Sequence, residues 1–186
     1  RIATGRFQDE ERQVGQASIA LGTTTDSYEL RFPDELRVRT QVLAVGRDSS
    51  GSQVQIAYAI AGSSLEPVTV TQGFLYSVRV RFVATDRQGR VAATLDTTRH
   101  FVAPAPVPEG EHLVGRVSLP VPTGRFEYRL AIQQGEEAGI VLPRDTMRVR
   151  QPTSTALALS DLVIGNRSAN LYWRRSEQDT VMFNPL

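Results

Sequence analysis

The chain has 186 residues, enough for one large β domain or two small ones, and it contains no cysteine, so disulfides and thiolate chemistry are excluded. Its 21 basic residues, all of them arginine, nearly balance 20 acidic residues. The resulting net charge of +1 provides no overall field that would attract nucleic acid or an anionic membrane.

The sequence shows neither a membrane-spanning stretch nor a signal peptide. No stretch approaches the roughly 20 apolar residues that a helix needs to cross a bilayer. The sequence opens at Arg1 rather than at Met and shows no signal peptide. We therefore expect a piece of a longer chain without a membrane span of its own.

The first 50 residues are expected to form an N-terminal β segment. Weak strand patterns occur at 14–21 and 28–32, and a stronger one follows at 36–45, where apolar and polar residues alternate. Alternation of this kind places one face of a strand on a core and the other in water. We predict that segment 1–50 packs on, or precedes, the main domain.

Residues 51–166 carry the clearest alternation, and no segment keeps apolar residues at helical spacing. Strong strands are predicted at 53–60, 76–84 and 125–133, and weaker ones at 90–101, 113–121, 146–150 and 156–164. Turn residues separate these strands at 47–52, 86–90 and 122–125. The pattern predicts an all-β, immunoglobulin-like antiparallel β-sandwich with extra N-terminal strands, followed by a C-terminal extension at 167–186.

A proline-rich segment, 102–111, interrupts the strand pattern. Pro104, Pro106 and Pro108 lack the backbone donor that a central strand needs. The segment is either a linker between two small domains or a stiff connection between the two sheets of one sandwich. We predict the inter-sheet connection.

Residues that could carry chemistry are few. His100 and His112 are the only histidines, and no spacing resembles a metal site. Ser160 and Asp161, with either histidine, contain the residue types of a catalytic triad, but no G-x-S-x-G motif encloses a serine. We predict no catalytic residues, no metal site and no cofactor.

The arginines provide the candidate site. Arg79 and Arg81 fall on the predicted outward face of a strand, where arginine either keeps the protein soluble and protects sheet edges or contacts a partner. Near the C-terminus, the single tryptophan stands beside a tyrosine and two arginines. The candidate protein interface consists of Arg79, Arg81, Tyr172, Trp173, Arg174 and Arg175.

Several phrases between 54 and 186 resemble, in their order, the β-rich region of GWxTD domain-containing proteins, a bacterial family found mostly in secreted or envelope-associated chains. The phrases lie at 54–67, 75–101, 117–139, 141–149, 157–165 and 179–186. The GWxTD signature itself is absent. The resemblance implies an immunoglobulin-like sandwich on the periplasmic or extracellular side of a bacterial envelope.

From these observations we expect a non-catalytic structural or interaction module. The expected role is that of an accessory or scaffold subunit of a membrane assembly, with protein partners and without nucleic acid. The alternative is a carbohydrate- or substrate-binding module of a larger secreted protein, which would need exposed aromatic residues on one face.

Overall fold

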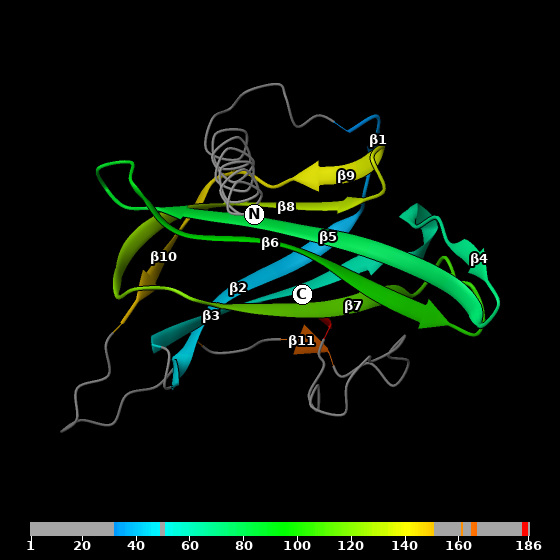
Figure 1. The fold of residues 1–186 in the computed structure, drawn as a ribbon, viewed down its shortest axis with the longest axis horizontal. Coiled ribbons are helices and arrows are strands. Elements are labelled where there is room, and N and C mark those ends of the chain that lie inside the picture. The colour runs from blue at the N-terminus through cyan, green and yellow to red at the C-terminus, as the bar shows by residue number, and fades with distance from the viewer. Residues whose placement is uncertain (1–31, 49–50, 151–160, 162–164, 167–183, 186) are drawn as a thin grey trace, which may run out of the picture.

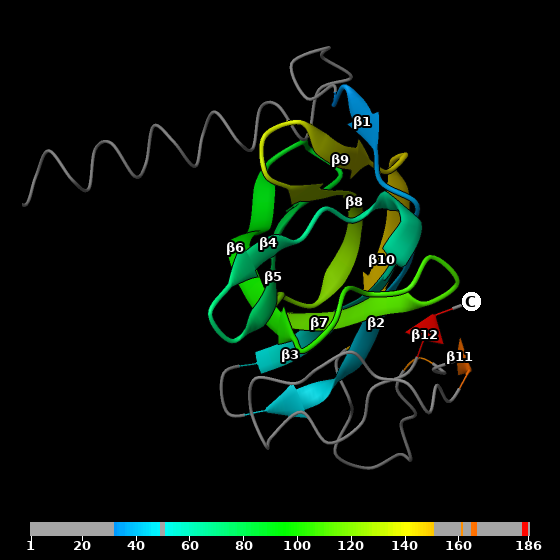
Figure 2. The same cartoon turned by 90° about the vertical axis from the view of Figure 1, so that its right-hand side faces the viewer.

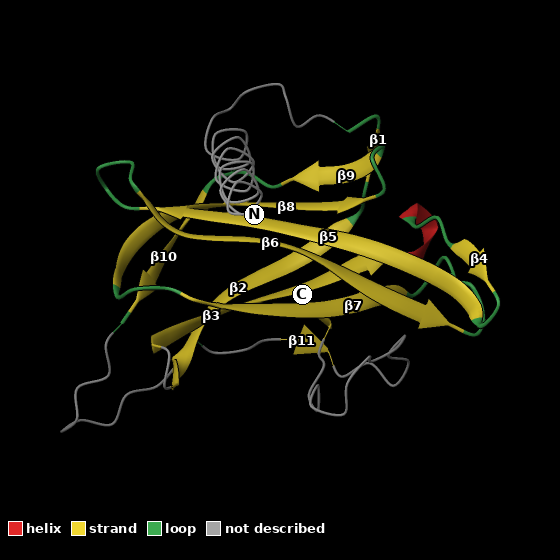
Figure 3. Cartoon of the chain, in the orientation of Figure 1, coloured by secondary structure: helices red, strands yellow, loops and turns green. Residues whose placement is uncertain are grey.

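The computed structural model describes residues 32–48, 51–150, 161, 165–166 and 184–185. This part of the chain is an all-β sandwich of two facing sheets (Figures 1 and 3), so the prediction of an all-β sandwich is confirmed. The elements are β1 (Asp34–Glu35), β2 (Val38–Asp48), β3 (Gly51–Ala61), the short 3-10 helix η2 (Gly62–Ser64), β4 (Val68–Val70), β5 (Gly73–Thr85), β6 (Val91–Ala103), β7 (His112–Pro120), β8 (Gly124–Gln134), β9 (Ala138–Val141), β10 (Asp145–Val149), β11 (Gly165–Asn166) and β12 (Asn184–Pro185).

The larger sheet has seven strands and is built around β5 and β8, which pair with each other. The other side of β5 pairs with β6, and short β4 extends the sheet beside the start of β5. The other side of β8 pairs with β10 along its first half and with β9 along its second half. Strand β8 therefore lies between β5 and β10, an arrangement on which the candidate site depends.

The smaller sheet has three strands in the order β2-β3-β7, and both pairs are antiparallel. In β3, Val54, Ile56, Tyr58 and Ile60 are fully buried. They alternate with residues on the other face of the strand, as the sequence pattern predicts. Gly115 of β7 leaves room for the Tyr58 ring, because a Cβ at that position would lie 2.1 Å from its Cζ atom.

The core lies between the two sheets. Strands β5 and β8 of the larger sheet contribute Val78, Val80, Phe82, Leu130 and Ile132, all inaccessible or nearly so to solvent. The rings of Phe82 and Tyr128 stack with their centroids 5.5 Å apart. Burial of these apolar side chains supplies the main driving force for folding, and no disulfide is needed.

Three details differ from the sequence-based expectation. Strands β4 and β9 were not predicted, and β1 pairs with β9 in parallel rather than antiparallel orientation. The turn at 122–125 does not close a hairpin, because β7 belongs to the smaller sheet and β8 to the larger one. The strands predicted at 14–21 and 28–32 lie outside the described residues, as does 156–164 except for Asp161.

The proline-rich segment runs from β6 in the larger sheet to β7 in the smaller one. The buried Val107 donates its backbone N–H to the Tyr76 hydroxyl at 2.8 Å. Gly62 allows the segment to pass closely, since a Cβ there would lie 2.2 Å from the carbonyl oxygen of Pro108. The connection is thus held against both η2 and β5.

Two short strands near the C-terminus, β11 and β12, pair with each other, and β12 lies beside β2 and β3 on the outside of the smaller sheet (Figure 2). Asp161 is bonded to β2 twice. Its carboxylate accepts the Ala44 N–H at 2.7 Å, and its own N–H donates to the Ala44 carbonyl at 3.2 Å. Within the described ranges, no helix is long and apolar enough to span a membrane.

Candidate binding surface

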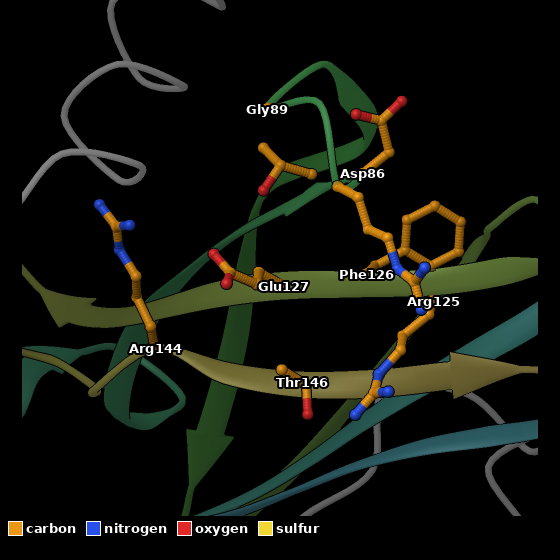
Figure 4. A pocket seen from close by; sticks show the side chains of 9 residues that line it. Asp86, Gly89, Arg125, Phe126, Glu127, Arg144 and Thr146 are labelled. Atoms are coloured by element: carbon orange, nitrogen blue, oxygen red, sulfur yellow. The ribbon is translucent and has the colours of Figure 1, made fainter.

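A concave region lies at the end of the sandwich where the β5–β6 turn, the β7–β8 turn and strand β10 meet. It consists of two adjoining depressions of about 500 and 970 Å³, which share Asp86, Arg87, Arg125 and Phe126. Figure 4 shows the first depression, with Asp86 and Gly89 of the β5–β6 turn on one side and Arg125, Glu127, Thr146 and Arg144 on the other.

The β5–β6 turn is organised by Asp86. Its carboxylate accepts the backbone N–H groups of Gln88 at 2.9 Å and Arg90 at 3.0 Å, and the Arg90 side chain binds it at 2.7–2.8 Å. Partial desolvation raises the pKa of Asp86, but these hydrogen bonds outweigh it, so the pKa lies below its ordinary value. Gly89 adopts φ +76°, which a turn of this kind requires. The negative charge of Asp86 is therefore balanced by its ion pair with Arg90.

Strand β10 and the residues directly before and after it present a row of side chains to the same region. Positions 144, 146, 148 and 150 are Arg, Thr, Arg and Arg, and all four are exposed, whereas Met147 and Val149 between them are buried. The pairing of β10 with β8 places Arg148 directly opposite Arg125 and Thr146 opposite Glu127. Two arginines thus occupy a facing cross-strand position on the outer face of the sheet.

The lining of the two depressions is strongly basic. It includes the five arginines 87, 125, 144, 148 and 150, against the two acids Asp86 and Glu127. Within the part of the chain that the structure describes, no salt bridge joins Arg87, Arg125, Arg148 or Arg150 to an acidic side chain. We call the surface defined by these four residues the arginine surface.

The predicted interface residue Arg79 lies on β5, elsewhere on the outer face of the same sheet. It forms a two-pronged ion pair with Asp96 of β6, Nε to Oδ1 at 2.7 Å and Nη2 to Oδ2 at 2.6 Å. The hydrogen bond to Asp96 raises the pKa of Arg79.

Arg81 was expected to face water, but only 8% of it is exposed. It lies on a central strand between β6 and β8, and its guanidinium donates to the side-chain oxygen of Gln133. Burial lowers the pKa of Arg81, and the charge of Arg79 lowers it further. The structure therefore places Arg81 in a buried polar contact.

The remaining predicted interface residues, Tyr172, Trp173, Arg174 and Arg175, lie outside the described residues. The prediction also missed the arginine surface. One signal could have revealed it: the run RDTMRVR at 144–150 has arginine at three of four alternate positions.

The two histidines lie in different sheets. His100 on β6 lies 2.9 Å from the Ser77 hydroxyl, whereas His112 begins β7 in the other sheet. Burial, and then the charge of Arg39, lowers the pKa of His112. Among the described residues, no group of three or more His, Cys, Asp or Glu residues is arranged to hold a metal ion.

The described residues also offer no row of exposed aromatic side chains of the kind that binds sugars. Tyr58, Tyr76, Phe82, Phe101 and Phe126 are buried, and the large exposed hydrophobic residues of this part are Val68 and Val91.

Comparison with known proteins leaves the family open. No family model and no curated protein matches the chain. Among solved structures, the chain is similar to the "Putative ApaA Protein from Bordetella pertussis", with 10% identity and a TM-score of 0.39 over 64% of this chain and 98% of that one. It is also similar to a structural-genomics target designated SoR45, with 13% identity and a TM-score of 0.34 over 70% of this chain and 96% of that one. Similarities at this level carry no functional argument.

Proposed function

We propose that the protein is a non-catalytic interaction module that binds a partner protein through the arginine surface. The observation that carries this proposal is the cross-strand pair Arg125–Arg148 at the rim of a concave region with excess positive charge. Like charges placed directly opposite each other destabilise a sheet. An unfavourable arrangement at a hollowed surface is understandable if a bound partner relieves it, since arginine is enriched in protein interfaces.

An immunoglobulin-like topology belongs to the proposal as well. Its support is the pair of facing sheets, built almost wholly from antiparallel strands, with connections that cross between them. The resemblance of segment 54–186 to GWxTD domain-containing proteins supports placing the module on the extracytoplasmic side of a bacterial envelope, as an accessory or scaffold subunit of a membrane assembly.

Site-specific photo-crosslinking in native cells tests the proposal. A photoreactive amino acid at Thr123, which lines the larger depression, should form an adduct of discrete mass with a partner protein. The matched control is the same amino acid at Val68, which is 61% exposed and lies on β4, beside the other end of β5. Equal labelling at both positions, or no discrete adduct at Thr123, would contradict the proposal.

A further inference from the structure

We infer that the arginine surface recognises an extended acidic segment of its partner, with carboxylates at every second residue. This inference names the chemistry of the partner and therefore rests on the proposed function. It follows from the spacing, the charge and the shape of the surface.

The spacing comes from strand geometry. Side chains on one face of a strand recur every second residue, about 6.5–7 Å apart. Thr146 and Arg148 are one such repeat within β10, and Arg150 follows directly after the strand ends at Val149. An extended peptide has the same repeat, so its alternate side chains can meet Arg148 and Arg150 in succession.

The charge favours a carboxylate at one particular place. Arg125 and Arg148 are register partners, so their Cβ atoms are about 5 Å apart. A carboxylate between them would accept hydrogen bonds from both guanidinium groups, and charge-assisted bonds of this type are roughly twice as strong as neutral ones. Arg87 and Arg150 line the same depression and supply further positive charge.

The shape and composition favour a peptide over other anions. Proteins that bind single-stranded nucleic acid combine basic grooves with exposed aromatic side chains. The aromatic residue in the lining, Phe126, is only 5% exposed. Thr85, Thr123 and Thr146 instead line the depressions with hydroxyl groups, which can bond to a peptide backbone. The surface is hollow, and a hollow fits a chain better than it fits a planar bilayer.

The test uses three labelled nine-residue peptides and fluorescence anisotropy on the whole chain. The first peptide alternates glutamate and threonine, the second has the same composition with its glutamates in one block, and the third alternates lysine and threonine. We expect the alternating acidic peptide to bind at least threefold more tightly than the block peptide, and the lysine peptide not to bind. Binding should weaken about tenfold between 50 and 200 mM salt, because screening by salt weakens contacts between exposed charges.

The decisive variant is Arg148→Glu, which should weaken binding of the alternating peptide at least tenfold. The matched control is Arg99→Glu, an equal change of charge at an exposed position on β6, which should change binding less than twofold. Arg148→Glu also creates an opposite-charge pair with Arg125, so its Tm should rise by about 1–2 °C. Loss of binding together with a higher Tm cannot result from unfolding.

The inference is wrong if the alternating and block peptides bind with equal affinity, or if Arg148→Glu and Arg99→Glu weaken binding equally. It is also wrong if a DNA oligonucleotide or phosphatidylglycerol vesicles bind more tightly than the acidic peptide. If the peptides fail to bind while the crosslink from Thr123 persists, the partner chemistry is wrong and the proposed function stands. If the peptide binds but Thr123 captures no protein in cells, the proposed function is wrong, and so is the inference that depends on it.

Discussion

Two pairs of arginines lie on the same outer face of the seven-stranded sheet, but their side chains have different neighbours. On β5, Arg79 is paired with Asp96 and Arg81 is bonded to Gln133. On β8 and β10, Arg125 and Arg148 face each other. The residue type, the sheet and the face are the same, so the difference lies in the neighbours.

The comparison separates arginines that support the structure from arginines available to a ligand. A guanidinium with a polar partner in the folded chain has little to gain from an external anion, because a new contact would have to replace an existing one. A guanidinium opposite another guanidinium gains from any anion that approaches. Three predictions test this distinction, and a fourth concerns the neighbouring Asp86–Arg90 pair; they are ordered from the largest expected effect to the smallest.

Arg81→Ala should lower the free energy of unfolding by about 2 kcal/mol, because it removes a buried contact and leaves the Gln133 oxygen without that donor. Denaturant unfolding measures this effect. The comparison variant is Arg79→Ala, which should cost about 1 kcal/mol or less, because its ion pair is partly exposed. If Arg79→Ala proved as costly as Arg81→Ala, burial would not be what distinguishes the two.

Asp96→Asn should lower the free energy of unfolding by about 0.5–1 kcal/mol by removing the charge that pairs with Arg79. The two side chains are 42% and 25% exposed, so solvent screens the interaction. The difference from the wild type should therefore shrink in 1 M salt, where charges are screened beyond about 3 Å. A loss that salt leaves unchanged would indicate a packing effect rather than an ion pair.

Arg148→Glu should raise the free energy of unfolding by about 0.5 kcal/mol, the opposite sign from Asp96→Asn, because it replaces a like-charge pair with an ion pair. The free energy of unfolding of Arg148→Gln should lie between those of Arg148→Glu and the wild type. The same denaturant titrations measure both. If Arg148→Glu instead destabilised the protein, Arg148 would already make a stabilising contact in the unbound protein. The contrast between the two pairs of arginines would then be wrong.

Asp86 should make the smallest contribution to stability, because its partner Arg90 is 77% exposed, and this contribution should depend on pH. The pKa of Asp86 is lower in the folded state than its ordinary value of 3.8. Its contribution is therefore present above that value and is lost as the pH falls through the lower, folded-state pKa. The Tm of the wild type should exceed that of Asp86→Asn at pH 5–7, and the two should converge toward pH 2.

The sequence predicted the long strands well, because eight or more alternating residues leave little ambiguity. It could not reveal β4 or β9, which are three and four residues long and too short to show a period. The sequence also could not predict which strands pair or in which register, because alternation assigns a residue to a face of a strand but not to a neighbour on the next strand. Arg79 and Arg81 therefore looked alike in the sequence. In the structure, Gln133 is the register partner of Arg79, but its side-chain oxygen accepts a hydrogen bond from Arg81, two positions further along β5.

The arginine surface shows the same limit. Arg125 and Arg148 are 23 positions apart in the sequence, and only the register of β8 with β10 makes them neighbours. The alternating arginines at 144–150 were visible in the sequence, but the hollow beside them was not. That hollow depends on two turns, one of which connects the two sheets rather than two paired strands.

The path of the chain between the two sheets has a consequence for how the protein unfolds. The chain passes from the smaller sheet to the larger after β3, returns through the proline-rich segment to β7, and crosses again to β8. Neither sheet can be completed from one continuous stretch of sequence, and neither buries its apolar face without the other. Melting should therefore be a single cooperative transition, and a chain divided at the proline-rich segment should yield two fragments that fold only when they are mixed.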